Sequence, residues 1–155
     1  MDLESVKRFL EGEEGKENES PVVDSMPSKF LEPLICHGLK IELVEPDRIL
    51  CSFKVPQRLV NSDNILNGGV TAALVDVVGA AAVFVGGAPN TGVSVEINVS
   101  YVDVAYTGDE VEIEAKVLRI RGPIAVVSVE LRNKKTGKVI AQGRHSKYLG
   151  RRSKL

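Results

Sequence analysis

The chain has 155 residues, a length typical of one domain. Its 20 basic and 21 acidic side chains give a net charge of −1, which disfavours a dedicated nucleic-acid binder. Two cysteines and two histidines exclude a disulfide scaffold and a three-histidine metal site, and no metal or prosthetic group is expected.

The N-terminal 34 residues form an acidic extension. Residues 2–10 predict a short amphipathic helix without the apolar stretch of a secretory signal. Residues 11–25 are acidic and contain Gly and Pro, which predicts a flexible linker. Residues 28–34 predict a helical turn, and the main domain is expected to span residues 35–149.

Period-two alternation begins at residue 39. Residues 39–44 and 49–55 alternate apolar and polar side chains around the turn at 45–47, which predicts two paired strands. A polar loop follows over residues 56–66.

The segment Gly68–Val85 is apolar on every side and holds one charge, Asp76. A helix without a polar face is expected to be buried all round. A membrane span is the alternative at about 18 residues. It is disfavoured because Ala, Val and Gly insert weakly and a central Asp costs about 2.5–3.5 kcal/mol.

The second half of the sequence predicts a series of consecutive strands. In the first, the Val, Ile and Tyr residues from Val93 to Tyr101 fall on one face, and the polar residues Ser94, Glu96, Asn98 and Ser100 on the other. Residues 111–117 alternate likewise, and the phase slips at Leu118 as at a bulge. Residues 125–131 and 139–148 predict two further strands, which are joined by a turn at 134–137. The fold class is therefore α+β, with a mostly antiparallel sheet wrapped around one long buried helix.

This pattern resembles the hotdog fold. The segments Asn61-Ser-Asp-Asn-Ile-Leu-Asn67-Gly68-Gly69, Leu74-Val-Asp76 and Thr136-Gly-Lys-Val-Ile-Ala-Gln-Gly-Arg-His145 are similar to small PaaI-like acyl-CoA thioesterases of the thioesterase superfamily member 2 group. The resemblance covers residues 35–150. It implies an acyl-CoA substrate, in which coenzyme A is part of the substrate rather than a cofactor.

Asp76 and Gly68 are the first candidates for catalysis. A carboxylate in an apolar helix is costly unless it caps a buried loop or serves as a general base or nucleophile. Glycine at a helix start exposes unpaired N–H groups that can stabilise the oxyanion formed from a thioester carbonyl. The resemblance implies the same roles. It adds Asn61 as a second donor to the carbonyl and Ser94 as the residue that helps Asp76 hold the attacking water.

Gly68 and Asp76 lie eight residues apart on one helix, which is about 12 Å along the axis. One thioester cannot comfortably touch both in one chain. We therefore expect a homodimer, possibly paired again into a tetramer, with Asn61 and Gly68 from one subunit and Asp76 and Ser94 from the other.

Asn67 departs from the family pattern His-Gly-Gly at the helix start. Asparagine is a good N-cap, so the helix start is preserved. A titratable imidazole is lost, which predicts an altered rate or substrate preference, or loss of activity. Because a thiolate is a stable leaving group, an acid is less essential here than in amide cleavage.

The remaining basic and nucleophilic residues give weaker hypotheses. His37 follows Cys36 directly, and neighbours in an extended chain face opposite ways, so a catalytic dyad is disfavoured. Residues 132–155 carry nine bases and no acid, which indicates a solvated face or a phosphate site. We expect His145 to join Arg144, Lys147, Arg151 and Arg152 in a basic rim for the phosphates of coenzyme A. Arg119 and Arg121, at a strand end, are equal candidates for these phosphates.

The terminal Ser153-Lys154-Leu155 resembles the peroxisomal import signal, which predicts a peroxisomal protein and the import receptor as a partner. The leading hypothesis is a peroxisomal acyl-CoA thioesterase. Alternatives are a thioesterase for an aromatic, dihydroxynaphthoyl-type acyl-CoA and a non-catalytic acyl-CoA binder. A dehydratase or hydratase is less favoured because no His is paired with an acid at helix-start spacing.

Overall fold

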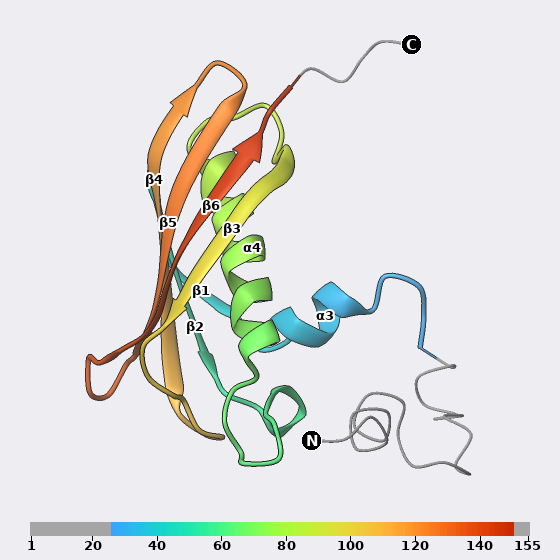
Figure 1. The fold of residues 1–155 in the computed structure, drawn as a ribbon, viewed down its shortest axis with the longest axis vertical. Coiled ribbons are helices and arrows are strands. Elements are labelled where there is room, and N and C mark those ends of the chain that lie inside the picture. Colours follow the sequence, from blue (N-terminus) through green and yellow to red (C-terminus); the bar gives the residue numbers. More distant parts are fainter. Residues whose placement is uncertain (1–25, 151–155) are drawn as a thin grey trace, which may run out of the picture. The chain divides into compact units, whose positions relative to one another are not determined.

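The computed structural model describes residues 26–150. One antiparallel sheet has the strand order β1-β2-β4-β5-β6-β3 (Figure 1). Its strands are β1 (Lys40–Glu45), β2 (Arg48–Lys54), β3 (Val93–Tyr101), β4 (Glu110–Arg121), β5 (Ile124–Asn133) and β6 (Val139–Tyr148). The predicted helix 2–10, the linker 11–25 and the terminal tripeptide lie outside the described residues, and the domain boundaries at 34 and 149 stay predictions.

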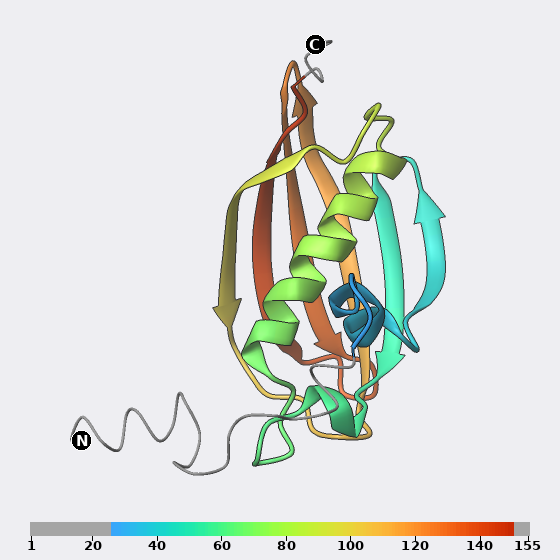
Figure 2. The same ribbon diagram turned by 90° about the vertical axis from the view of Figure 1, so that its right-hand side faces the viewer.

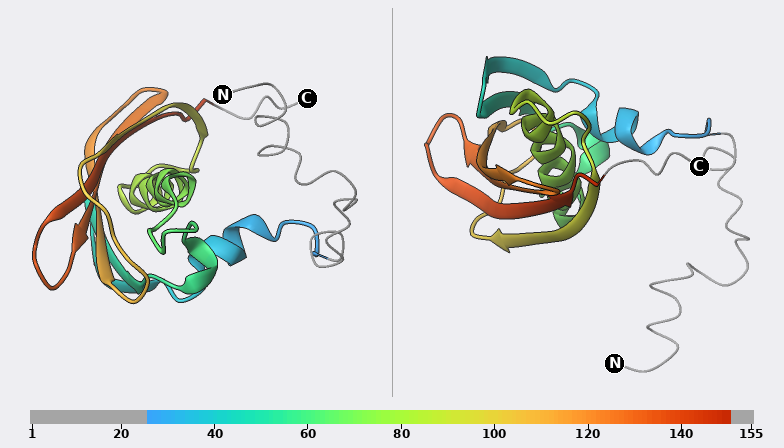
Figure 3. Two further views of the ribbon diagram at one scale, coloured as in Figure 1. Left: turned by 60° about the horizontal axis from the view of Figure 1, so that its bottom comes forward. Right: turned by 90° about the horizontal axis from the view of Figure 1, so that it is seen from above.

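The long predicted helix is present as α4 (Gly68–Val85). It crosses one face of the sheet, with β3 at one sheet edge and β1 at the other (Figure 2). Seen near its axis, α4 lies inside the curve of the sheet (Figure 3). The shorter helices are α3 (Leu31–Cys36), which begins three residues after the start of the predicted turn, and the 3-10 helix η1 (Gln57–Leu59).

The core lies between α4 and the concave face of the sheet. Strands β4 and β5 direct every second side chain inward, as the alternation predicted. The side chains that are fully buried there include Val111, Ile113, Val127, Val129 and Leu131. From α4, which contacts β4 and β5, Leu74, Val75 and Val78 are buried with them. Burial of these apolar side chains holds the helix in the curve of the sheet.

Two of the register shifts in the sheet bear on the predictions. The slip predicted at Leu118 is confirmed, since the β4–β5 register shifts between Val117 and Arg119. A second shift, between Ser94 and Glu96 in β3, was not predicted. The extra residue Val95 reverses the alternation, so Ser94 faces α4 rather than sharing a face with Glu96. The predicted grouping of Ser94 with the polar face of β3 is therefore wrong.

The side of α4 away from the sheet is only partly covered. The expectation of burial all round is wrong for the single chain, in which Phe84 is 61% exposed. Within residues 26–150, α4 is the helix long and apolar enough to span a membrane by length and composition. Its buried residues face the sheet, which favours a core helix.

Gly143 of β6 supports the close approach of α4. An added Cβ would lie 2.9 Å from the Asn98 carbonyl oxygen and 3.0 Å from Val75 Cγ1. Gly143→Ala is therefore expected to lower the free energy of unfolding by about 1–3 kcal/mol, measured by urea denaturation. Ser146→Ala, on the opposite face of β6, is the control and should change it by less than about 0.5 kcal/mol. Equal effects of the two substitutions would contradict this close packing.

Candidate active site

Asp76 lies in the middle of α4, and its side chain is 46% exposed. Its carboxylate oxygen Oδ1 accepts a hydrogen bond from Ser94 Oγ at 3.2 Å. The same oxygen lies 3.4 Å from Nε2 of His145. One carboxylate is therefore both accessible and oriented by two side chains, as a general base requires.

Ser94 reaches Asp76 because of the bulge in β3. Ser94 is opposite Lys147 of β6, and Ile97 is opposite His145, so two residues between them on β3 face one on β6. Cross-strand partners direct their side chains to the same face of a sheet. Ser94 thus joins His145 and Lys147 on the face that meets α4, and the bulge positions a functional residue.

His145 also belongs to this cluster. The sequence analysis named it only as a phosphate candidate and missed its place beside Ser94 and Asp76. Its side chain is fully buried, and Nε2 lies 2.8 Å from Ser94 Oγ. Since the Ser94 hydroxyl donates to Asp76, its oxygen accepts from His145, which assigns the Nε2–H tautomer. Nδ1 has no hydrogen-bond partner among the described residues and lies 3.0 Å from a Cβ built on Gly79. Gly79 therefore leaves room for the ring.

Burial lowers the pKa of His145, and the positive charge of Lys147 lowers it further, against the opposing effect of Asp76. The imidazole is consequently neutral near pH 7. A protonated ring would also bury an unpaired Nδ1–H, which carries a further penalty.

This lowered pKa predicts a loss of stability in acid. Below about pH 6.5, the ordinary value, the unfolded chain binds a proton at residue 145 that the folded chain resists, so unfolding becomes easier as pH falls. Urea denaturation between about pH 7.5 and 5.5 should show a smaller decline for His145→Gln than for the wild type. His37→Gln, which removes an imidazole outside the Asp76 cluster, is measured beside it as the control for the substitution. Equal slopes for wild type and His145→Gln would contradict the assignment.

A second group of candidates gathers at the N-terminus of α4. Asn67 is the N-cap, and its Oδ1 accepts from Gly69 N at 2.8 Å, as its residue type predicted. Tyr101 donates to the Gly68 carbonyl oxygen at 2.7 Å and covers this turn. The Gly68 N–H donates to no group within residues 26–150, and the residue is exposed. An unpaired N–H at the positive end of a helix can bind an oxyanion.

Asn61 lies in the loop that leads into α4. The bridge between Val60 and Leu66 closes this loop. The Asn61 Oδ1 accepts from Asp63 N and Ile65 N, both at 3.0 Å. These two bonds hold the amide oxygen toward the backbone of its own loop. The Nδ2 group is therefore the part of the side chain that can donate to a ligand.

The structure thus forms two groups from the predicted residues. Asp76 and Ser94 form one with His145. Asn67 and Gly68 form the other at the N-terminus of α4, and Asn61 lies in the loop that leads into it. Both Gly68 and Asp76 belong to α4, eight residues and about 12 Å apart along its axis. Within one chain the groups are separate.

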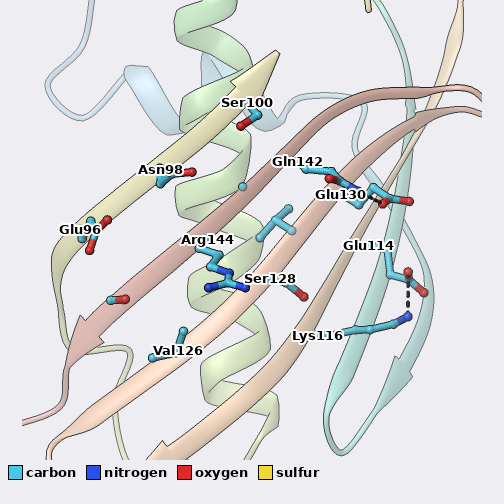
Figure 4. Close-up of a pocket in the computed structure, with 13 residues that line it drawn as sticks. Glu96, Asn98, Ser100, Glu114, Lys116, Val126, Ser128, Glu130, Gln142 and Arg144 are labelled. Atoms are coloured by element: carbon cyan, nitrogen blue, oxygen red, sulfur yellow. Dashed lines mark hydrogen bonds and ion pairs between the residues drawn. The ribbon is translucent and has the colours of Figure 1, made fainter. Parts of the chain in front are cut away.

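The five basic candidates within residues 26–150 do not form one rim. His145 and Lys147 are buried beside Ser94, whereas Arg144 points to the opposite face of the sheet because neighbours on a strand alternate. Arg144 lines a hollow of about 630 Å³ there, with Asn98 and Ser128 (Figure 4). Arg119 and Arg121 are exposed opposite Val126 and Ile124 on that same outer face. The expected rim of His145 with Arg144 and Lys147 is therefore wrong. The outer hollow is not the Asp76 site.

Comparison with known proteins settles the family. A family model described as the thioesterase superfamily matches residues 63–140. The chain belongs to the thioesterase superfamily. The acyl-coenzyme A thioesterase 13 of Mus musculus is 42% identical over 113 residues, which cover 72% of this chain and 81% of that protein.

Solved structures agree with this thioesterase superfamily assignment. The zebrafish thioesterase superfamily member 2 has a TM-score of 0.75 and 31% identity, covering 97% of this chain and 99% of that one. The PaaI protein of E. coli, at 18% identity, shares the fold with a TM-score of 0.68, covering 77% of this chain and 90% of that one. The predicted hotdog fold and the predicted family are confirmed.

Proposed function

We propose that this thioesterase superfamily member hydrolyses acyl-CoA thioesters by attack of a water molecule that Asp76 activates. The observation that carries the proposal is the accessible Asp76 carboxylate held by Ser94 beside a buried, neutral His145. The activity named for the Mus musculus relative supports the same reaction class.

The proposed chemistry uses protein side chains and backbone groups, the acyl-CoA and one water molecule. Asp76 takes a proton from water while the water oxygen bonds to the thioester carbonyl carbon. The carbonyl oxygen becomes an oxyanion, which the Gly68 N–H and the Asn61 amide stabilise. The C–S bond then breaks, the coenzyme A thiolate leaves, and the proton from Asp76 neutralises it.

We infer that two subunits share each site. Strand β3 is an edge strand of the sheet that residues 26–150 form, and its Val93 and Val95 are each 64% exposed. An exposed apolar edge strand is a template for pairing with another strand. An antiparallel second copy on this edge would also cover the half-exposed side of α4 and bring Gly68 of one copy near Asp76 of the other. A further pairing of dimers into a tetramer remains part of the proposal.

Asn67 predicts a rate effect at the helix start. Its amide oxygen caps the helix, so only its Nδ2 group can face a substrate, without a titratable proton. Asn67→His is expected to raise kcat by up to about 10-fold, because an imidazolium can protonate the leaving thiolate. The measurement is thiol release, with Asn90→His, in the loop after α4, as the control. An unchanged or lower kcat would show that the asparagine at this position does not limit the rate of hydrolysis.

Within this function, the main alternatives differ in the identity of the acyl group. An aromatic acyl-CoA and a fatty acyl-CoA use the same Asp76 chemistry and differ only in the wall of the acyl pocket. A non-catalytic acyl-CoA binder is the alternative from another class, motivated by Asn67.

The deciding experiment measures thiol release from saturated acyl-CoAs of several chain lengths and from benzoyl-CoA. Wild type and Asp76→Ala are compared, and binding is measured by calorimetry. Turnover that depends on Asp76 supports the thioesterase, and the preferred substrate identifies the acyl class. Binding of the acyl-CoAs without turnover of any would overturn the thioesterase in favour of the binder.

Localisation and phosphate binding complete the proposal. Ser153-Lys154-Leu155 supports import into peroxisomes by the receptor for that signal. A fluorescent fusion at the N-terminus should lose peroxisomal localisation when these three residues are deleted. Arg119 and Arg121, both exposed, stay candidates for the phosphates of coenzyme A.

A further inference from the structure

Lys147 is a buried charge that the proposed reaction does not use. The residue is 4% exposed, yet it lies on β6 two positions after His145. No carboxylate within residues 26–150 forms an ion pair with its ammonium group. Because burial of an unpaired charge is costly, such a lysine calls for a compensating role.

The ammonium group has one hydrogen-bond acceptor among the described residues. Lys147 Nζ donates to Ser94 Oγ at 3.4 Å, a long contact, and the two residues are cross-strand partners in the β6–β3 pair. The same oxygen lies 2.8 Å from His145 Nε2. Two donors therefore converge on one hydroxyl oxygen.

This convergence fixes the direction of the Ser94 proton. A hydroxyl has two acceptor lone pairs and one hydrogen. Lys147 and His145 occupy the acceptor side, so the hydrogen is left for Asp76 Oδ1, which lies 3.2 Å away. We propose that Lys147 is a positioning residue, whose ammonium group, with His145, directs the Ser94 hydroxyl onto the Asp76 carboxylate. This inference rests on the proposed function of Asp76.

The charge around His145 supports this arrangement. Of the elements packed against the ring, α4 contributes Asp76 and β6 contributes Lys147 as charged groups. Strands β3 and β5 place the uncharged Ser94, Ile97 and Val127 there. Burial is the main cause of the lowered pKa of His145, and the positive charge of Lys147 adds to it. The neutral ring serves as a donor to Ser94 through Nε2–H alone.

A double-mutant cycle tests the proposal. Lys147→Met keeps the unbranched apolar stem but removes the terminal donor. We expect it to lower kcat about 10- to 100-fold with KM little changed. If Lys147 acts through Ser94, Lys147→Met should cost nothing further in a Ser94→Ala background. The control is Lys138→Met, an exposed lysine just before β6, which should keep wild-type kcat.

Proton NMR gives a readout independent of turnover. The chain has two histidines, and His37→Gln assigns their signals. The His145 titration midpoint is expected to rise in Lys147→Met and to stay in place in Lys138→Met. If Lys147→Met does not fold, Lys147→Gln takes its place, since it keeps an N–H donor without the charge. It should raise the His145 midpoint in the same way, with a smaller loss of kcat.

Three results would overturn the proposal. The first is a Lys147→Met variant whose kcat stays within twofold of the wild-type kcat. If Asp76→Asn is inactive in the same assay, the proposed function of Asp76 still holds. The second is losses that multiply in the Ser94→Ala background, which would show that Lys147 acts independently of Ser94. The third is an unmoved His145 midpoint. A wild type that turns over no acyl-CoA would instead overturn the proposed function, and the NMR result would still report on Lys147.

Discussion

Asp76→Asn is expected to lower kcat for acyl-CoA hydrolysis by about 10²–10⁴-fold with little change in KM. The amide has the shape of the carboxylate and can still accept from Ser94, so the fold and the substrate contacts are retained. It cannot take the proton from the attacking water. The measurement is thiol release at saturating acyl-CoA, with circular dichroism to confirm that the variant folds.

A matched control comes from Asp47, an exposed carboxylate in the β1–β2 turn. Asp47→Asn makes the same chemical change at a distance from α4 and should keep the wild-type kcat. Retention of kcat by a folded Asp76→Asn variant would place the general base elsewhere in the molecule.

A heterodimer of two inactive variants is expected to recover about half of the wild-type activity. One chain carries Asn61→Ala and the other Asp76→Asn, and differently tagged copies are co-expressed and purified through both tags. If each site takes Asn61 and Gly68 from one chain and Asp76 from the other, one of the two sites receives both substitutions. The other site receives none and works normally.

The alternative geometry gives a different result. If each site lay within one chain, both sites of the heterodimer would carry a damaging substitution and activity would stay near that of the single variants. The same purification of two tagged wild-type chains sets the reference value. An active protein that sediments as a monomer would also contradict the shared site.

Periodicity predicted most of the fold. The two early strands, α4, the slip at Leu118 and the antiparallel strands after Tyr101 follow from alternation and from one long apolar run. These patterns are local, because burial of one face repeats every second residue in a strand, and a sequence records that repeat directly.

The bulge at Val95 produces no comparable pattern in the sequence. Val93 to Tyr101 alternate without interruption in sequence, and the bulge becomes visible only in the register against β6. The misplacement of Ser94 follows from this, since one extra residue moves every side chain before it to the other face. The error in grouping Arg144 with His145 was avoidable, because β6 alternation alone separates them.

Residue type and position by themselves determined that Asp76 and Gly68 were candidates, since a charge in an apolar helix and glycines at a helix start stand out in the chain. Asn61 and Ser94 became candidates only through the family resemblance. The sequence also determined the family, through motifs that survive as short local segments. Only the tertiary structure decided which side chains meet. His145 and Lys147 lie far from Asp76 along the chain, and their contact with Ser94 depends on the pairing of β3 with β6 and on a one-residue bulge. Strand register is a long-range property, and in β3 no local pattern encodes it.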